Sequence, residues 1–179
     1  MIQHLRDEAL LLLEGRGAIL DVARHITRVM DAAGMDGAVI GGVAVVLHNY
    51  VRTTVGVDLF VPGSLEDVSS ALRAAGYRFD AKRREFRKQR VPVHLVSSQQ
   101  VTTPPRGSVV IEGVRTVRLA DLLNMKLESG LRDPLRAIDL ADVIGLIRAH
   151  RLTPTFAGCL SRGLRVEFRK LARAVAKGD

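Results

Sequence analysis

Apolar residues follow two different spacings along this chain. Near both ends they recur every three or four positions, as Ile19, Val22 and Ile26 do, which is the period of an amphipathic helix. In the middle of the chain, short apolar runs such as residues 54–61 are bounded by glycine, proline or charged residues, which is typical of strands. We therefore predict one domain with N-terminal helices in residues 1–34, an α/β core in residues 35–118 and a helical part in residues 119–179.

The two spacings also locate individual elements. Ser64 can cap a helix, because Asp67 follows three residues later. Strands in the middle of a chain with helices on either side favour an α/β fold in which a mixed sheet is flanked by helices. We predict helices over residues 2–14, 17–33, 65–75, 120–129, 134–150 and 161–176, a short helix ending near Asn49, strands over 38–40, 54–61, 84–89 and 91–96, and a hairpin turning at Glu112-Gly113.

Composition narrows the class of protein without identifying a site. The formal net charge of +8 favours attraction to polyanions such as nucleotides, nucleic acid or an acidic partner. Aromatic residues make up only 4 % of the chain and Trp is absent, which disfavours a surface that binds single strands by base stacking.

The longest apolar run, residues 38–47, has ten residues and two glycines, whereas a bilayer-spanning helix needs roughly 20. The lone Cys159 can form no intrachain disulfide, which fits a reducing compartment, and it has no evident catalytic partner. We therefore expect a cytoplasmic protein that does not enter a membrane, with a structural role for Cys159.

Three charged residues fall on apolar helix faces near the end of the chain. On a helical wheel Lys126 lies in the centre of the apolar side of its helix, and Asp139 and Asp142 share a stripe with Leu135, Ile138 and Leu146. A buried unpaired charge costs several kcal/mol. These residues therefore either form an internal ion pair that joins the two helices or line a polar cleft.

One stretch carries a motif. A strand ends at Gly41-Gly42, which opens a short helix containing His48, and the next strand brings "GVD" with Asp58. Glycines between a strand and a helix commonly present backbone N–H groups to a phosphate. We interpret His48 as a core or capping residue.

Together with Arg52, Thr54 and the later Lys126, Asp139 and Asp142, this motif resembles the nucleotidyltransferase-fold proteins. Within them it is most similar to the small bacterial branch related to abortive-infection toxins. The resemblance covers roughly half of the chain, strongly in residues 38–61 and moderately in residues 114–147.

The resemblance implies transfer of a nucleoside monophosphate from a nucleoside triphosphate to a hydroxyl, with Mg²⁺ or Mn²⁺ as cofactor. Two bridging ions need several carboxylates around them. By the resemblance, the metal ligands would be Asp58 and His94, the catalytic residues Asp58, Lys126 and Asp139, and the nucleotide-binding residues Gly41, Gly42, Arg52 and Thr54.

The sequence departs from the family pattern at two of the three expected acids. Gly56 occupies the position of the first, and His94 aligns best with the third. Imidazole suits zinc or nickel better than magnesium, and we expect neither Glu85 nor Glu112 to supply the missing acid. We therefore expect impaired transfer or a noncatalytic relative.

Residue 138 also departs from the pattern. Relatives often carry a basic residue directly before the first late aspartate, whereas this chain has Ile138 there and Arg136 two residues earlier.

A different class of function rests on the run "AKRREFRKQR". Its cations would bind an RNA or DNA backbone or an acidic protein partner, on a fold kept only as a scaffold. The alternative is an edge strand whose charges prevent association with other sheets. The candidate binding residues are Arg83, Arg84, Arg87 and Lys88.

Overall fold

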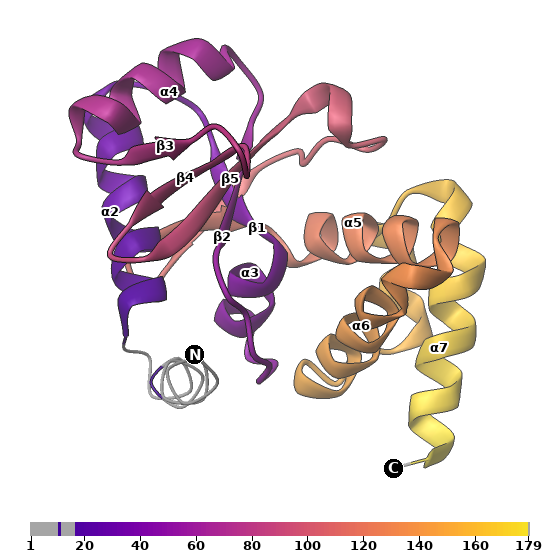
Figure 1. Ribbon diagram of the computed structural model, residues 1–179. Coiled ribbons are helices and arrows are strands. Elements are labelled where there is room, and N and C mark those ends of the chain that lie inside the picture. Colours follow the sequence, from indigo (N-terminus) through magenta and orange to yellow (C-terminus); the bar gives the residue numbers. More distant parts are fainter. Residues whose placement is uncertain (1–10, 12–16, 179) are drawn as a thin grey trace.

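The computed structural model describes residue 11 and residues 17–178, so the helix predicted over residues 2–14 lies almost entirely outside the described residues. Within them, seven strands form one mixed sheet in the order β3-β4-β5-β2-β1-β7-β6 (Figure 1). The strands are β1 (Ala38–Ile40), β2 (Val57–Val61), β3 (Arg78–Asp80), β4 (Glu85–Lys88), β5 (Val91–Ser97), β6 (Ser108–Ile111) and β7 (Val114–Val117).

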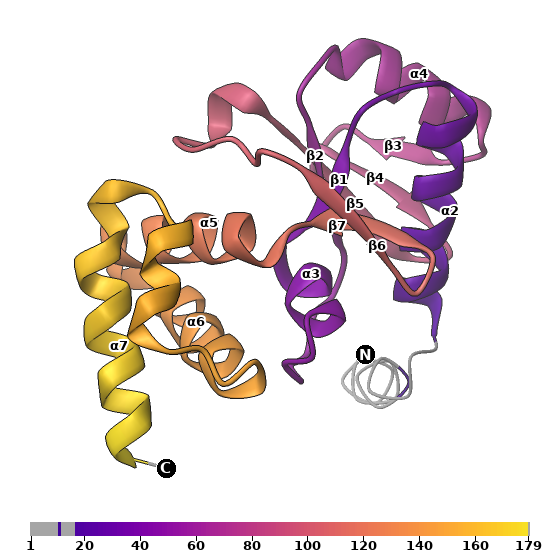
Figure 2. The same cartoon turned by 180° about the vertical axis from the view of Figure 1, so that it is seen from behind.

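Helices cover the sheet on both sides. Figures 1 and 2 show α2 and α4 together at one side, and α5, α6 and α7 grouped at the other, next to α3. None of the described helices is long and apolar enough to cross a membrane. The α-helices are α2 (Ala18–Ala32), α3 (Gly41–Leu47), α4 (Leu65–Ala74), α5 (Leu119–Arg132), α6 (Ala137–Ala149) and α7 (Arg165–Gly178).

The alternation of side chains along the central strands separates two hydrophobic clusters. On β1, Val39 belongs to the cluster beneath α2 and α4, whereas Ala38 and Ile40 belong to the cluster that includes α5, α6 and α7. Strand β2 divides in the same way between Leu59 and Phe60. Successive residues of a strand point to opposite faces of the sheet, so the central strands pack against both layers of helices.

Most of the predicted elements are confirmed, and the α/β fold with a mixed sheet and flanking helices is as predicted. The hairpin turns at Glu112-Gly113, where both residues have positive φ angles, and Ser64 accepts the backbone N–H of Asp67 at the start of α4. Strand β3 was not predicted, because its three residues give no periodic signal. Its presence places β4 inside the sheet, so the basic run is not an edge strand there.

The predicted burial of Leu135 and Ile138 is wrong, because these side chains are 92 % and 55 % exposed. Pro134–Arg136 form a 3-10 turn, and α6 begins only at Ala137. Leu135 therefore falls outside the α-helical period, and Ile138 lies at the margin of the buried stripe.

Candidate functional site

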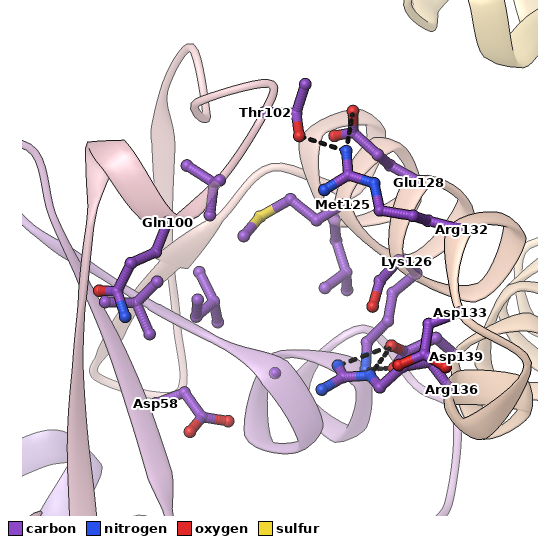
Figure 3. Close-up of a pocket in the computed structure, with 16 residues that line it drawn as sticks. Asp58, Gln100, Thr102, Met125, Lys126, Glu128, Arg132, Asp133, Arg136 and Asp139 are labelled. Carbon is purple, nitrogen blue, oxygen red and sulfur yellow. Dashed lines mark hydrogen bonds and ion pairs between the residues drawn. The ribbon is translucent and has the colours of Figure 1, made fainter. Parts of the chain in front are cut away.

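A cavity of about 490 Å³ lies between the sheet and helices α5 and α6. Asp58 bounds it on the sheet side, and Lys126 and Arg136 bound it on the helical side (Figure 3). Gly41, the first residue of α3, also lines it. Its size suits a small-molecule ligand. The other lining residues are Ile40, Val96, Gln100, Val101, Thr102, Leu122, Met125, Glu128, Ser129, Arg132, Asp133 and Asp139.

The two glycines that open α3 allow the helix to approach β2 closely. A Cβ atom on Gly41, where φ is +68°, would lie 2.1 Å from Oδ2 of Asp58. A Cβ atom on Gly42 would lie 2.6 Å from Oγ1 of Thr54, which donates to the carbonyl oxygen of Gly56 at 3.3 Å. The sequence thus places a carboxylate directly beside the first turn of α3.

Gly56 has a steric reason to lack a side chain. A Cβ atom at this position would lie 2.6 Å from the carbonyl oxygen of Pro92 on the neighbouring strand β5. That oxygen belongs to the backbone, so no change of rotamer relieves the contact. An acidic side chain therefore does not fit at position 56 in this arrangement of the sheet.

Asp58, His94 and Glu85 lie in a row across three adjacent strands. Asp58 is opposite His94 in the β2–β5 pair, and the pairing of Phe86 with Val93 sets Glu85 beside His94. The Nδ1 atom of His94 is 3.2 Å from Oδ1 of Asp58, and Nε2 is 3.1 Å from Oε2 of Glu85. The histidine ring thus lies between the two carboxylates.

Lys126 is buried with two carboxylates at hydrogen-bond distance. Its Nζ atom lies 2.6 Å from Oδ1 of Asp139 and 2.8 Å from Oδ2 of Asp142. Arg136 donates to Oδ2 of Asp139 from Nε at 2.8 Å, and Arg52 donates from Nη1 to Oδ2 of Asp142 at 2.6 Å. The network has three cations and two carboxylates, which leaves one positive charge in excess. The internal ion pair and the polar cleft predicted from the sequence are both present, because Lys126, Asp139 and Asp142 join α5 to α6, and Lys126 and Asp139 line the cavity together with Arg136.

The environment of Asp139 favours its ionised form. Burial alone would raise the pKa of this carboxyl group, but the hydrogen bond and charge of Lys126, with help from Arg136, outweigh burial and hold the pKa below its usual value. Asp139 thus remains a carboxylate at neutral pH, and it fixes both cations at the cavity wall.

The other sequence candidates have different surroundings. His48 is buried and donates from Nε2 to the carbonyl oxygen of Val117 at 2.8 Å, as a core histidine would. In the basic run, Arg83 and Arg84 are exposed, whereas Arg87 donates to Glu85 at 2.6 Å. Lys88 donates to the carbonyl oxygen of Ala75 at 2.7 Å, and Nη1 of Arg83 lies 4.0 Å from Oε1 of Glu85, so three of the four candidate cations have partners within the chain.

No protein-family model matches this chain, and no curated protein matches it significantly. Solved structures do match. The structure of ANT(2")-Ia in complex with adenylyl-2"-tobramycin is 15 % identical over 84 % of this chain and 96 % of its own, with a TM-score of 0.58. An antigenic nucleotidyltransferase-like protein from Paracoccidioides brasiliensis is 18 % identical over 72 % and 74 % of the two chains, with a TM-score of 0.52.

A protein of H. pylori proposed to be a nucleotidyltransferase is 14 % identical, covers 87 % of this chain and 92 % of its own, and has a TM-score of 0.55. The chain has a nucleotidyltransferase-like fold. At this level of identity the likeness shows the fold alone, so activity and ligands have to be argued from the residues of the site.

The resemblance seen in the sequence motif implies a nucleoside triphosphate and divalent metal ions. The residues around Asp58 do not fit a cluster of metal-binding carboxylates, because Gly56 has no side chain and Glu85 points to His94. Among the described residues, no group of three or more His, Cys, Asp or Glu side chains is arranged to hold a metal ion.

The sequence patterns do not indicate two residues in and near this site. Glu85 does not align with an expected acid, yet the β4–β5 pairing brings it to His94, which contacts Asp58 at the cavity. Arg136 lies two residues before the position where relatives often carry a basic residue, yet it lines the cavity and contacts Asp139. The alternation of polar Glu85 with buried Phe86 was the available signal for the first. No local signal indicated the second.

Proposed function

We propose that this chain binds a nucleoside triphosphate in the cavity between the sheet and helices α5 and α6. The observation that carries the proposal is that Asp58 faces Lys126 and Arg136 across one cavity of suitable size, which Gly41 also lines. The excess cation of the Lys126 network supports binding of an anionic group at that wall. Thr54 and Gly42 support the proposal by fixing the loop that precedes β2.

We further propose that transfer of a nucleoside monophosphate to a hydroxyl acceptor is impaired in this chain. Asp58 is the one carboxylate of the expected three that is present, and its neighbours His94 and Glu85 contact each other. Even the loss of a residue that supports a metal ligand costs roughly 10- to 100-fold in affinity or activity. Loss of two ligands should therefore cost more.

The toxin-related branch of the fold is proposed on the sequence motif alone, through Gly41-Gly42, Arg52 and "GVD". An acceptor hydroxyl could belong to a small molecule, a nucleic acid or a protein. The positive net charge of the chain supports an anionic acceptor.

Nucleotide binding is tested by isothermal titration of the purified chain with each of the four ribonucleoside triphosphates in Mg²⁺ buffer. We expect saturable binding of at least one, which Arg136→Ala weakens about tenfold or more, because a hydrogen bond to a charged group contributes about 1.5–3 kcal/mol. Arg173→Ala is the matched control, since Arg173 is an exposed arginine of α7 and does not line the cavity. Absence of binding by all four nucleotides would end the proposal.

Impaired transfer is tested with α-labelled triphosphates and RNA or protein acceptors in Mg²⁺ and in Mn²⁺. We expect at most slow labelling, and Asp58→Ala should abolish what remains. Rapid labelling by the unaltered chain would contradict the impairment, and labelling that persists after Asp58→Ala would show that the reaction occurs elsewhere.

A second candidate function is binding of a nucleic acid by the β3–β4 surface. The observation in its favour is that Arg83 and Arg84 are exposed in the turn between β3 and β4, and that the side chain of Phe79 on β3 is 46 % exposed. Exposed cations and an exposed aromatic ring on one hairpin suit backbone contacts and stacking. Here Asp58 would have no role.

Gel-shift titration at several salt concentrations separates this function from nucleotide binding. The double change of Arg83 and Arg84 to Ala should weaken RNA binding and flatten its salt dependence. The double change of Arg162 and Arg173 to Ala removes the same charge elsewhere and should have less effect. Equal effects of the two double changes would exclude the β3–β4 surface as the binding site.

A further inference from the structure

The row formed by Asp58, His94 and Glu85 is fixed from its buried end. Glu85 is 7 % exposed, and Nε of Arg87 lies 2.6 Å from its Oε1 atom. Its other oxygen, Oε2, faces Nε2 of His94 at 3.1 Å. Both oxygens of this buried carboxylate thus have partners within the chain.

The opposite end of the row reaches the cavity. Asp58 lines the cavity, and its Oδ1 atom lies 3.2 Å from Nδ1 of His94 while its Oδ2 atom faces Gly41. The ring of His94 therefore has one carboxylate at each nitrogen. His94 and Glu85 do not line the cavity themselves.

A divalent ion bound here would need the same oxygens. Magnesium takes oxygen ligands at about 2.0–2.1 Å and manganese also prefers oxygen ligands, usually from one or more carboxylates that converge on a single point. The imidazole ring lies between Asp58 and Glu85, so these carboxylates converge on His94 and not on a shared ion position. Position 56 cannot add a ligand, because Pro92 leaves no room for a side chain.

We propose that His94 takes the place of a divalent ion between Asp58 and Glu85, and that a carboxylate at position 94 is sufficient to convert the row into a metal site. This inference rests on the proposed function in one respect: if transfer is impaired, His94 is the cause of the impairment. Metal binding by the row requires no nucleotide, so this inference can fail while nucleotide binding holds, and the reverse.

The conversion has a physical basis in the charges of the row. Replacement of His94 by aspartate places three carboxylates side by side on neighbouring strands, where like charges repel one another. A divalent cation relieves that repulsion and finds three oxygen ligands from β2, β5 and β4. Unfolding loses this arrangement, so the cation should stabilise the altered chain against heat.

The test uses the full chain without nucleotide and Mn²⁺ alone as the probe. Mn²⁺ binding is measured by electron paramagnetic resonance, and thermal unfolding is followed with and without the ion. We expect His94→Asp to bind Mn²⁺ at least about tenfold more tightly than the unaltered chain, and to melt lower without Mn²⁺ and higher with it.

Two further variants serve as controls. His94→Asn is close in size to His94→Asp but adds no charge, and it should bind Mn²⁺ as weakly as the unaltered chain. Adding Glu85→Gln to His94→Asp removes the buried carboxylate, and it should remove most of the gain. If that double variant keeps the full gain, Glu85 is not part of the site and the proposal fails.

Other outcomes also decide the matter. The proposal is overturned if the unaltered chain binds Mn²⁺ as tightly as His94→Asp, or if folded His94→Asp binds no more tightly than His94→Asn. If His94→Asp is unfolded without metal, we expect Mn²⁺ to restore the circular dichroism spectrum of the folded chain. No recovery of that spectrum would also overturn the proposal.

Discussion

Replacing Gly41 by alanine tests whether this glycine exists to admit Asp58. Gly41 has a φ of +68°, and an added Cβ atom would lie 2.1 Å from Oδ2 of Asp58. Gly34 is a matched control, because its φ is +62° but an added Cβ atom would meet nothing within 4 Å. Both changes place a side chain in the left-handed region, and only the change at Gly41 adds a steric clash.

The magnitudes follow from these two contributions. A non-glycine residue in the left-handed region destabilises the folded chain by about 1–2 kcal/mol. Replacing glycine by alanine also restricts the unfolded chain, which stabilises the folded state by about 0.4–1 kcal/mol. Gly34→Ala should thus lower the free energy of unfolding by about 0–1.6 kcal/mol. The clash at Gly41 adds about 1–3 kcal/mol, towards the lower end because the Asp58 carboxylate can rotate away at the loss of its contact with His94.

The assay is urea unfolding followed by circular dichroism, with triphosphate affinity measured on the same samples. We expect Gly41→Ala to be less stable than Gly34→Ala by about 1 kcal/mol or more, and to bind nucleotide more weakly, because Asp58 is displaced into the cavity. Equal losses of stability in the two variants would refute the steric argument. Unchanged nucleotide affinity in folded Gly41→Ala would separate Asp58 from the binding site.

Three other changes test the packing and charges of the site. Gly56→Asp should lower the free energy of unfolding by about 1–3 kcal/mol without restoring activity; urea unfolding measures this, and a neutral effect would contradict the contact with Pro92. Lys126→Met leaves two buried carboxylates short of a partner and should cost about 3 kcal/mol in thermal unfolding, whereas Arg169→Met on α7 should cost far less. Burial lowers the pKa of His48 below 6.5, so the unfolded chain binds the proton more readily and stability should rise with pH through that region. His48→Asn should flatten this rise, and an unchanged slope would show that other groups cause it.

Local patterns predicted the helices and the hairpin well. The spacing of Ile19, Val22 and Ile26 predicts α2, and all three are buried. The position of Lys126 at the centre of an apolar helix face predicts a buried charge with carboxylate partners, which the contacts with Asp139 and Asp142 confirm. Each of these predictions depends on residues within a few helical turns, where spacing alone determines which side chains share a face.

Contacts that depend on strand pairing could not be obtained in the same way. Glu85 and His94 are nine residues apart, and a shift of one residue in the β4–β5 register would turn Glu85 to the other face of the sheet. The steric reason for Gly56 likewise comes from Pro92, on a strand that is parallel to β2 and distant in sequence. The burial error at Leu135 arose where a 3-10 turn interrupts the helical period.

The carbonyl oxygen behind Gly56 also limits how this sheet can be redesigned. The space that a side chain at position 56 would need is occupied by the backbone of β5 at Pro92. A larger residue there would require a displacement of β5, which carries His94 and pairs with both β2 and β4. An acidic group can therefore be introduced at position 94 by a change of side chain alone, whereas position 56 demands a change of backbone.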